Sequence, residues 1–221
     1  MAEINRVAFL ERDEDGLKLT NGKIALRADF SSLKRRIRAG NVSSELVVKA
    51  AKIKGIVRPL RIVDATAGLG EDSFLLAAAG NEVLMFEYDE TVAALLSDAL
   101  ERAGNDPELR EIVSRMSLTP SDSVKGMKDL SYKPDVILLD PMFPERTKSA
   151  EVKKKFQLIH LLEKPCDDEG SLLDAAITAK PAKIIIKRPL KGPFLAGKEP
   201  DYSFSGKAIR FDVLLFPDNF K

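Results

Sequence analysis

From residue 61 onward, the sequence alternates short apolar runs with segments whose apolar residues recur at helical spacing. Continuous apolar runs are typical of strands buried on both faces, and parallel strands need a crossover, usually a helix, between them. The alternation therefore predicts an α/β fold built on a mostly parallel sheet. The expected strands are residues 61–65, 82–88, 115–118, 135–140 and 183–187, and the expected helices are residues 71–79, 90–103 and 171–179.

The N-terminal part of the chain has a different pattern. Asn21-Gly22 separates two short alternating stretches, which is a strong signal for a two-residue β-hairpin. Residues 31–54 have helical spacing in two pieces that divide near Gly40, with Ser43 as the expected N-cap of the second piece. We therefore expect a small N-terminal appendage made of a β-hairpin and helices.

The C-terminal part, residues 202–216, has strand-like composition on both sides of Gly206. This predicts a terminal β-hairpin that turns near the glycine. A chain of 221 residues is long enough for one α/β domain with a full core. We expect the appendage to occupy residues 1–56 and the main domain to occupy residues 57–221.

The first expected strand leads into the segment DATAGLG, residues 64–70, which precedes an expected helix. In an open α/β sheet, ligands bind at this position, beyond the carboxyl end of a strand. Gly68 and Gly70 allow the backbone to turn tightly and to approach a ligand, and Asp64 ends the strand beside them. An ordinary strand-to-helix turn can carry the same glycines. A dinucleotide fingerprint would need a third glycine where this chain has Ser73, so the pyrophosphate-binding pattern is incomplete.

Acidic residues follow the first three expected strands at the same edge of the sheet. Glu87 ends the second strand about 20 residues beyond the glycines, where a carboxylate can accept hydrogen bonds from both ribose hydroxyls. Glu71 and Asp72 open the first crossover helix and are expected to line the methionine side of the pocket. Asp122, with Ser123 beside it, follows the third strand and can accept a hydrogen bond from an adenine amino group. This set suits S-adenosylmethionine better than NAD.

The fourth expected strand runs into Asp140-Pro141-Met142-Phe143. This segment resembles the D/N-P-P-Y/F signature of methyltransferases that act on an amino group conjugated to a base ring. Such an amine is a poor nucleophile, and we expect the Asp140 carboxylate and the Pro141 carbonyl to hold its N–H groups so that the lone pair faces the methyl donor. Phe143 is expected to stack on the base, with a contribution of about 1–3 kcal/mol. A target base within a helix must first be flipped out.

The composition narrows the classes of protein that remain. One cysteine, Cys166, and one histidine, His160, exclude an intrachain disulfide and a cysteine or histidine metal cluster. No apolar run is long enough to cross a bilayer, and the first residues lack the pattern of a signal peptide, so we expect a cytoplasmic protein. With a formal charge of +1, any contact with nucleic acid must be regional. Basic clusters lie at residues 34–38, 148–155 and 187–191, and each alone is typical of a solvated face. Two of the three follow expected strand ends at the catalytic edge, where phosphate contacts are expected.

Several segments resemble the ribosomal RNA small-subunit methyltransferase J family, whose members methylate guanine N2 in 16S ribosomal RNA. The matching strings are DATAGLG with Asp72, VAALL at 92–96, LDPMFP at 139–144 with KSA at 148–150, KRP at 187–189 and RFD at 210–212. The resemblance implies a class I S-adenosylmethionine-dependent methyltransferase fold with a Rossmann-like, mostly parallel, seven-stranded sheet. It also implies cofactor contacts at Glu71, Asp72, Glu87, Tyr88, Asp122, Ser123 and Asp140.

These observations lead to one leading hypothesis and two alternatives. The leading hypothesis is methyl transfer from S-adenosylmethionine to a guanine N2 in small-subunit ribosomal RNA, without a metal. The first alternative keeps the chemistry and changes the acceptor to adenine N6 or to a protein glutamine amide. The second alternative is a noncatalytic RNA-binding scaffold that retains the methyltransferase fold.

Overall fold

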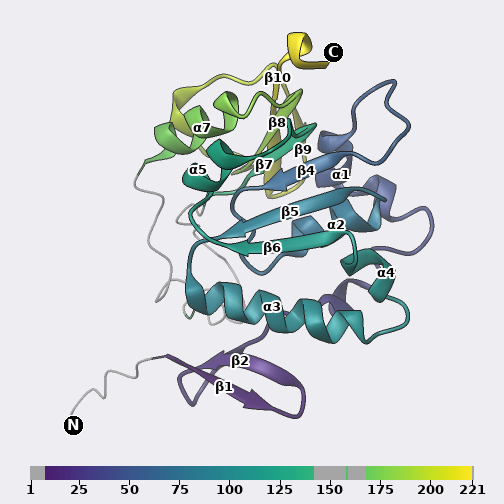
Figure 1. Cartoon of the computed structure of the whole chain (residues 1–221), viewed down its shortest axis with the longest axis vertical. Helices are drawn as coiled ribbons and strands as arrows, with labels where there is room; N and C mark the ends of the chain where they lie inside the picture. Colours follow the sequence, from purple (N-terminus) through teal and green to yellow (C-terminus); the bar gives the residue numbers. More distant parts are fainter. Residues whose placement is uncertain (1–7, 142–157, 159–167, 221) are drawn as a thin grey trace.

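A seven-stranded sheet forms the centre of the protein, whose computed structural model describes residues 8–141, 158 and 168–220 (Figure 1). Its strands are β4 (Arg61–Asp64), β5 (Glu82–Glu87), β6 (Met116–Pro120), β7 (Val136–Leu139), β8 (Lys183–Pro189), β9 (Tyr202–Ser205) and β10 (Ile209–Leu215). Their order across the sheet is β6-β5-β4-β7-β8-β10-β9, and only the pairings of β10 with its two neighbours are antiparallel. The predicted mostly parallel, seven-stranded sheet is confirmed.

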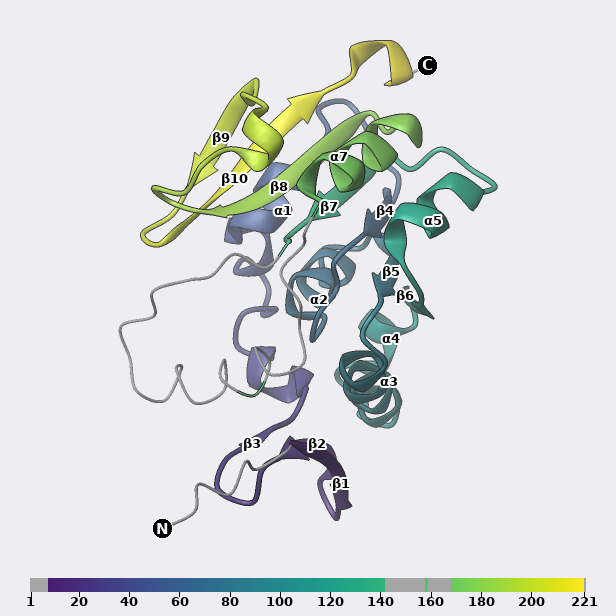
Figure 2. The same ribbon diagram turned by 90° about the vertical axis from the view of Figure 1, so that its left-hand side faces the viewer.

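Helices cover both faces of this sheet (Figure 2). The α-helices are α1 (Leu46–Ala51), α2 (Glu71–Ala78), α3 (Glu90–Gly104), α4 (Arg110–Val113), α5 (Ser123–Gly126) and α7 (Glu169–Thr178). Helices α1 to α4 pack with one hydrophobic cluster, and α7 packs with a second cluster on the opposite face. The three long helices that were predicted between strands are confirmed, and each end lies within two residues of its predicted position.

The position of strand β7 in the sheet explains why residues 136–139 form an unbroken apolar run in the sequence. Val136 and Leu138 belong to the first cluster, and Ile137 and Leu139 belong to the second. Successive side chains of a strand point to opposite faces, so a strand covered on both sides must be apolar at every position. All four side chains are fully buried. The polar residue that follows, Asp140, therefore lies where the strand leaves the core.

The N-terminal segment forms a separate three-stranded antiparallel sheet of β1 (Phe9–Asp13), β2 (Gly16–Thr20) and β3 (Ala25–Leu26). The hairpin predicted around Asn21-Gly22 is confirmed as the turn between β2 and β3. The strand β1, which pairs with β2, was not predicted because four of its five residues are exposed and show no alternation of polar and apolar side chains.

The helical prediction for residues 31–54 is partly wrong. Only α1 is an α-helix, while the first piece consists of turns and the short 3₁₀ helix η1 (Phe30–Leu33), and η2 (Val42–Ser44) is also 3₁₀. The N-cap of α1 is Glu45 and not Ser43, whose hydroxyl donates to the carbonyl of Gly40 at 3.3 Å. The Glu45 carboxylate accepts two hydrogen bonds from Arg36, at 2.9 and 2.7 Å. Glu45 thus begins α1 two residues later than predicted, with its side chain bound to Arg36 and not to the helix backbone.

The N-terminal segment packs on the main sheet domain through apolar contacts. The rings of Phe30 and Phe74 are stacked, with centroids 4.7 Å apart and planes 8° apart. Leu19 and Leu33 belong to the same hydrophobic cluster as α2. The division of the chain into domains at residue 56 stays a prediction.

The C-terminal hairpin is confirmed as β9 and β10, joined by a turn in which the Gly206 N–H donates to the carbonyl of Ile209 at 2.8 Å. The last described element is the 3₁₀ helix η5 (Pro217–Phe220). Within the described part of the chain, no helix is both long and apolar enough to span a membrane.

Candidate functional site

A cavity of about 1240 Å³ opens at the carboxyl ends of β4, β5 and β7. Parallel strands bring the segments that follow them to one edge of the sheet, and the candidate residues were predicted to lie at this edge. Every described candidate lines this cavity. These residues are Asp64, Gly68, Gly70, Glu71, Asp72, Glu87, Tyr88, Asp122, Ser123, Asp140 and Pro141. Phe143, Met142, Cys166 and His160 lie outside the described residues.

The glycine turn between β4 and α2 depends on two backbone conformations that favour glycine. Gly68 and Gly70 have φ values of +55° and +78°. A Cβ atom on Gly70 would lie 2.7 Å from Leu96 Cδ1 and 3.3 Å from the ring of Phe30, whereas a Cβ on Gly68 would meet nothing within 4 Å. Gly70 is therefore required for close packing, while Gly68 faces the open cavity.

Asp64, at the end of β4, is a buried carboxyl without a basic partner among its described contacts. It accepts hydrogen bonds from the Ser73 hydroxyl at 2.6 Å and from the Thr66 N–H at 3.1 Å. Burial raises the pKa of Asp64 to about 7, although both hydrogen bonds act in the opposite direction. Ser73 thus has a structural reason to stand where a dinucleotide fingerprint has glycine.

Glu87, the predicted ribose ligand, is nearly buried at the end of β5. Its Oε2 accepts from the Gly68 N–H at 2.8 Å, and its Oε1 accepts from the Asp89 N–H at 2.9 Å. Burial raises the pKa of Glu87 and outweighs these hydrogen bonds, which lower it. The two backbone donors hold the carboxylate against the glycine turn, in a fixed position on the cavity wall.

Asp122 and Ser123 lie where β6 leads into α5. Asp122 is the N-cap of this short helix, and its Oδ1 accepts from the Val124 N–H at 2.8 Å. Ser123 is buried. This hydrogen bond fixes the Asp122 carboxylate at the rim of the cavity, and Asp122 is one of the residues that line the cavity.

Asp140, directly after β7, is held from two sides. Its N–H donates to the Thr66 hydroxyl at 2.6 Å, and its Oδ2 lies 2.9 Å from Lys187 Nζ. The same ammonium lies 2.8 Å from Asp72 Oδ2. Burial alone would lower the pKa of Lys187, but the two carboxylates outweigh it and raise that pKa. One cation therefore joins a candidate cofactor residue to the candidate catalytic residue.

The role of Lys187 inside the cavity was not predicted from the sequence, which grouped it with a basic cluster suited to phosphate contacts. The neighbouring Arg188 is also turned inward, and its Nη1 donates to Glu169 at 3.0 Å. Adjacency of β7 and β8 could have identified the Lys187 contact, because the ends of paired parallel strands face each other.

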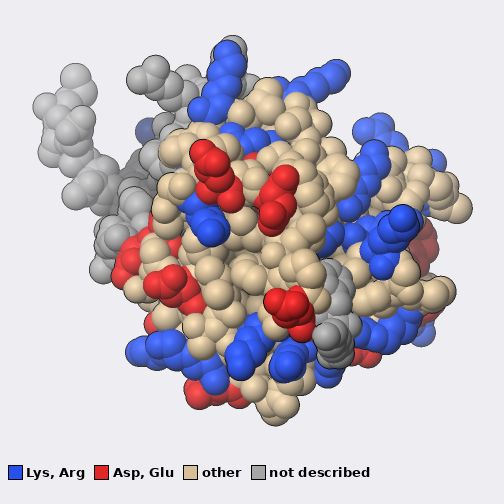
Figure 3. Space-filling model, turned by 90° about the horizontal axis from the view of Figure 1, so that it is seen from above, with Lys and Arg blue, Asp and Glu red and all other residues tan. Residues whose placement is uncertain are grey.

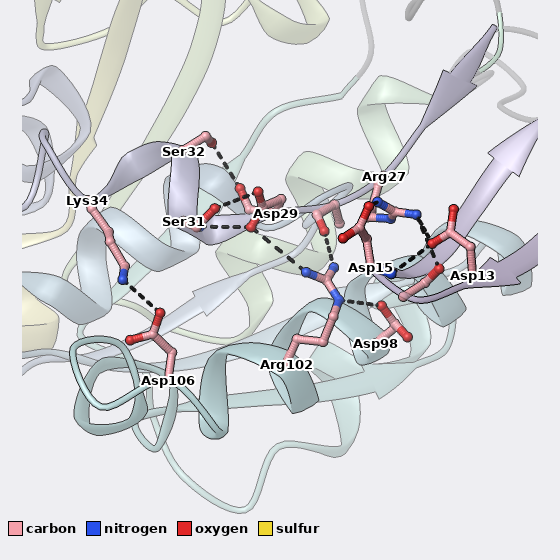
Figure 4. A network of polar contacts seen from close by, with 12 residues as sticks. Asp13, Asp15, Arg27, Asp29, Ser31, Ser32, Lys34, Asp98, Arg102 and Asp106 are labelled. Carbon is pink, nitrogen blue, oxygen red and sulfur yellow. Dashed lines mark hydrogen bonds and ion pairs between the residues drawn. The ribbon is translucent and has the colours of Figure 1, made fainter.

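The second wall of the cavity was also missed. It comes from the N-terminal sheet and the segment after it, and it includes Asp13, Lys18, Arg27, Asp29 and Phe30. This wall is attached to α3 by the polar network in Figure 4.

At the centre of that network, Arg102 of α3 donates to the carboxylate of Asp98 at 2.7 Å and to the carbonyl of Ala28. Its Nη1 also lies 3.8 Å from Asp29. Burial works against the charge of Asp98, but the hydrogen bonds from Arg102 and from backbone outweigh it and keep the pKa of Asp98 below its usual value.

Comparison with known proteins identifies the family to which this chain belongs. Residues 3–216 match the family model described as "Putative SAM-dependent methyltransferase". The chain is 42% identical over 192 residues to ribosomal RNA small subunit methyltransferase J of Pseudomonas aeruginosa, which covers 85% of this chain and 73% of that protein. The chain belongs to the ribosomal RNA small subunit methyltransferase J family. The corresponding protein of Neisseria meningitidis is 40% identical over 208 residues, covering 93% of this chain and 82% of the relative.

Solved structures agree with membership of this family. A SAM-dependent methyltransferase from Neisseria gonorrhoeae is 33% identical, with a TM-score of 0.77 over 97% of this chain and 85% of the other. An rRNA methyltransferase from Streptomyces viridochromogenes is 16% identical with a TM-score of 0.54, which shows a shared fold. The chain is thus a class I S-adenosylmethionine-dependent methyltransferase, as the sequence predicted.

The cavity fits the cofactor of this methyltransferase family. Its volume of about 1240 Å³ exceeds that of pockets for small ligands, which are commonly about 300–1,000 Å³. The wall offers a fixed carboxylate, Glu87, beside the open face of Gly68, which suits a ribose with two hydroxyls. The absence of a Cβ on Gly68 leaves room for a ligand to approach the backbone there. The individual contacts of the cofactor stay predictions.

Proposed function

We propose that this enzyme transfers a methyl group from S-adenosylmethionine to the exocyclic N2 of a guanine in small-subunit ribosomal RNA. Two lines support the substrate. Relatives that share about two fifths of their residues with this chain are named ribosomal RNA small subunit methyltransferase J. The segment after β7 offers two hydrogen-bond acceptors, and an exocyclic amine presents two N–H donors.

The observation that carries the proposal is the double support of Asp140. Thr66 fixes its backbone, and Lys187 fixes its carboxylate and stabilises the negative charge. A carboxylate held in this way is an acceptor in a defined position. With the adjoining Pro141 carbonyl, it can align the amine and keep the nitrogen lone pair out of conjugation with the ring. Holding the amine nitrogen in line with the methyl donor in this way lowers the entropic cost of the reaction.

The cofactor has its own proposed contacts. Glu87 and Tyr88 would hold the ribose, Asp122 and Ser123 the adenine, and Glu71 with Asp72 the methionine end, with the glycine turn and Asp64 beneath. When bound, the sulfonium supplies an activated methyl group, so the protein needs no covalent intermediate. The residues of this chain therefore act by binding, by orienting the amine and by excluding water.

The RNA-binding surface is proposed to be regional. Figure 3 shows Lys and Arg distributed over one face with Asp and Glu between them, and the formal charge is +1. A protein of this kind relies on local phosphate contacts and on stacking of an extruded base, for which Phe143 is the proposed side chain.

The test is methylation of RNA followed by identification of the product. Small ribosomal subunits and their naked RNA, both from a strain that lacks the enzyme, are incubated with the purified protein and labelled S-adenosylmethionine. Nucleoside mass spectrometry should find N2-methylguanosine. We expect Asp140→Asn to lower kcat by about 100-fold or more, because it removes the fixed charge from the acceptor pair. Cofactor affinity should change less than kcat.

The matched control is Asp129→Asn, which changes an exposed carboxylate outside the cavity and should leave the rate unchanged. N6-methyladenosine or a methylated glutamine as the product would replace guanine with one of the other acceptors. Absence of cofactor binding by calorimetry, in a folded protein, would support a noncatalytic scaffold and remove the proposal.

A further inference from the structure

The loop that follows β8 lies beside the candidate active site. Lys187, near the end of β8, contacts Asp140, and the chain then continues through Leu190 into the 3₁₀ helix η4 (Leu195–Gly197). The Leu190 N–H donates to the carbonyl of Ala208 at 2.9 Å. The loop and the β9–β10 turn are therefore side by side at the same edge of the sheet, as Figure 2 shows.

A buried arginine of β10 fixes the backbone of this loop. Arg210 Nη1 donates to the carbonyls of Pro189, Leu190 and Gly192 at 2.8, 2.9 and 3.0 Å. Its Nε donates to Asp212 at 2.8 Å, and both charged residues are nearly inaccessible. Removing two charges from water is costly, so a pair buried in this way indicates that the loop conformation is maintained at some expense to stability. The backbone of the loop is therefore fixed by hydrogen bonds, while several of its side chains are exposed to solvent.

The aromatic ring of Phe194 rests on this support and remains partly open. The Arg210 guanidinium lies 5.1 Å from the ring centroid, and 37% of Phe194 is exposed. Leu190, beside it in the loop, is exposed to the same extent. The η4 helix behind the ring is held by a hydrogen bond from the Ala196 N–H to Glu169 at 3.0 Å. An aromatic ring fixed from one side is a suitable partner for a nucleobase, because every base can stack on it.

Two exposed lysines belong to this loop and to the turn that adjoins it. Lys191 follows Leu190 in the loop, and Lys207 precedes Ala208 in the adjoining turn. Within the described part of the chain, neither lysine makes an ion pair. Ammonium groups without carboxylate partners, next to a stacking surface, favour a polyanion over an apolar protein partner.

We propose that Leu190, Lys191, Phe194 and Lys207, the rim platform, bind a nucleotide of single-stranded RNA next to the guanine that enters the active site. Phe194 stacks on the neighbouring base, and the lysines contact the flanking phosphates. This inference rests on the proposed function, because it takes RNA as the substrate. Its consequence is that part of the sequence preference around the target is set outside the cavity.

The test measures RNA binding separately from methyl transfer. A short fluorescein-labelled single-stranded RNA of mixed sequence is titrated with the full-length protein, and the Kd is obtained from anisotropy at several salt concentrations. We expect Phe194→Ala to raise the Kd by about 5- to 100-fold, and Phe194→Trp to retain binding. Lys191→Ala and Lys207→Ala should each lower the slope of log Kd against log salt by about 0.7.

Matched controls lie at the opposite edge of the sheet. Tyr202→Ala removes an aromatic side chain that is 39% exposed, and Lys133→Ala removes an exposed lysine that precedes β7. Both should leave the Kd unchanged, and cofactor affinity should be unchanged in every variant. Equal RNA binding by Phe194→Ala and Tyr202→Ala would overturn the inference. If the wild type is a dimer in solution and Phe194→Ala is a monomer with an unchanged Kd, the inference is also overturned, since the platform then binds a second copy.

Methylation assays distinguish this inference from the proposed function. If the wild type methylates subunit RNA and Phe194→Ala has the same KM and kcat, only the rim platform is wrong. If the wild type produces no methylated guanine while the anisotropy contrast persists, the proposed function is wrong, and the platform stands only as an RNA-binding surface without a neighbouring target guanine.

Discussion

The cavity has two walls that are stabilised in different ways. The sheet wall, residues 64–72 and 86–89, is fixed by strand pairing and by backbone N–H donors to Asp64 and Glu87. The hairpin wall, residues 13–30, is attached to α3 by charged side chains such as Arg102, whose side chain is 29% exposed. Arg102 keeps part of its charge in solvent, where salt screens it, whereas the backbone hydrogen bonds of the sheet wall are buried. We therefore expect salt to loosen the hairpin wall more than the sheet wall.

Gly70 is where the two walls meet, and its replacement should have the largest effect. In Gly70→Ala, the methyl group would press on Leu96 and Phe30 in a backbone conformation that disfavours alanine. We expect a loss of about 2–5 kcal/mol of stability from strain and overpacking, with a loss of cofactor affinity. Thermal unfolding and calorimetry measure both quantities.

Gly80→Ala is the matched control, since Gly80 also has a positive φ, of +92°, but its added Cβ would meet nothing within 4 Å. It should cost some stability and no cofactor affinity. If both variants bind the cofactor equally well, close packing at the junction of the walls is not required.

Asp64 should give the sheet wall a distinctive pH dependence. Its pKa is about 7 in the folded protein and near 3.8 in an unfolded chain, so between these values the folded state binds more protons. Stability from this group therefore falls as the pH rises from about 4 to about 7, by at most about 4 kcal/mol. Asp64→Asn should remove that slope in urea unfolding curves measured across this range. Parallel pH profiles for variant and wild type would contradict the assignment.

Arg102→Ala should loosen the hairpin wall and leave the sheet wall intact. The change removes the donor to the Ala28 carbonyl and one partner of buried Asp98, at a cost of about 1–3 kcal/mol. We expect faster hydrogen exchange in β1 and β2 and a cofactor Kd that rises by up to about tenfold. Arg115→Ala, which breaks a pair with the exposed Glu111, is the control and should change neither. Unchanged protection of β1 and β2 would show that apolar contacts alone hold the wall.

Lys34→Ala should have the smallest effect. Lys34 pairs with half-buried Asp106 at 2.7 Å and with exposed Glu108 at 3.2 Å, and neither pair includes a fully buried carboxylate. Pairs of this kind contribute little at physiological salt. Urea unfolding should not resolve the variant from the wild type, and a loss as large as that of Arg102→Ala would contradict the ranking of the contacts.

The sequence allowed prediction of the sheet wall but not of the hairpin wall, for a physical reason. The carboxyl ends of parallel strands meet at one edge of the sheet. A local pattern such as the apolar run before Asp140 therefore predicts that the next residue lies at this edge, without knowledge of distant contacts. The contact of Lys187 with Asp72 joins residues 115 positions apart, and that of Arg102 with Ala28 joins residues 74 apart. A lysine that pairs with half-buried acids looks, in sequence, like a lysine on the surface.

The ammonium of Lys187 between Asp72 and Asp140 also has a thermodynamic consequence. Asp72 lies on the side proposed for the cofactor, and Asp140 lies on the side proposed for the target base. A ligand that draws the Lys187 ammonium toward one of these carboxylates therefore changes the electrostatic field at the other. The affinities of the two substrates are then linked, and by reciprocity each must change the binding of the other by the same factor. We therefore expect the donor and the acceptor to bind with cooperativity that Lys187 transmits.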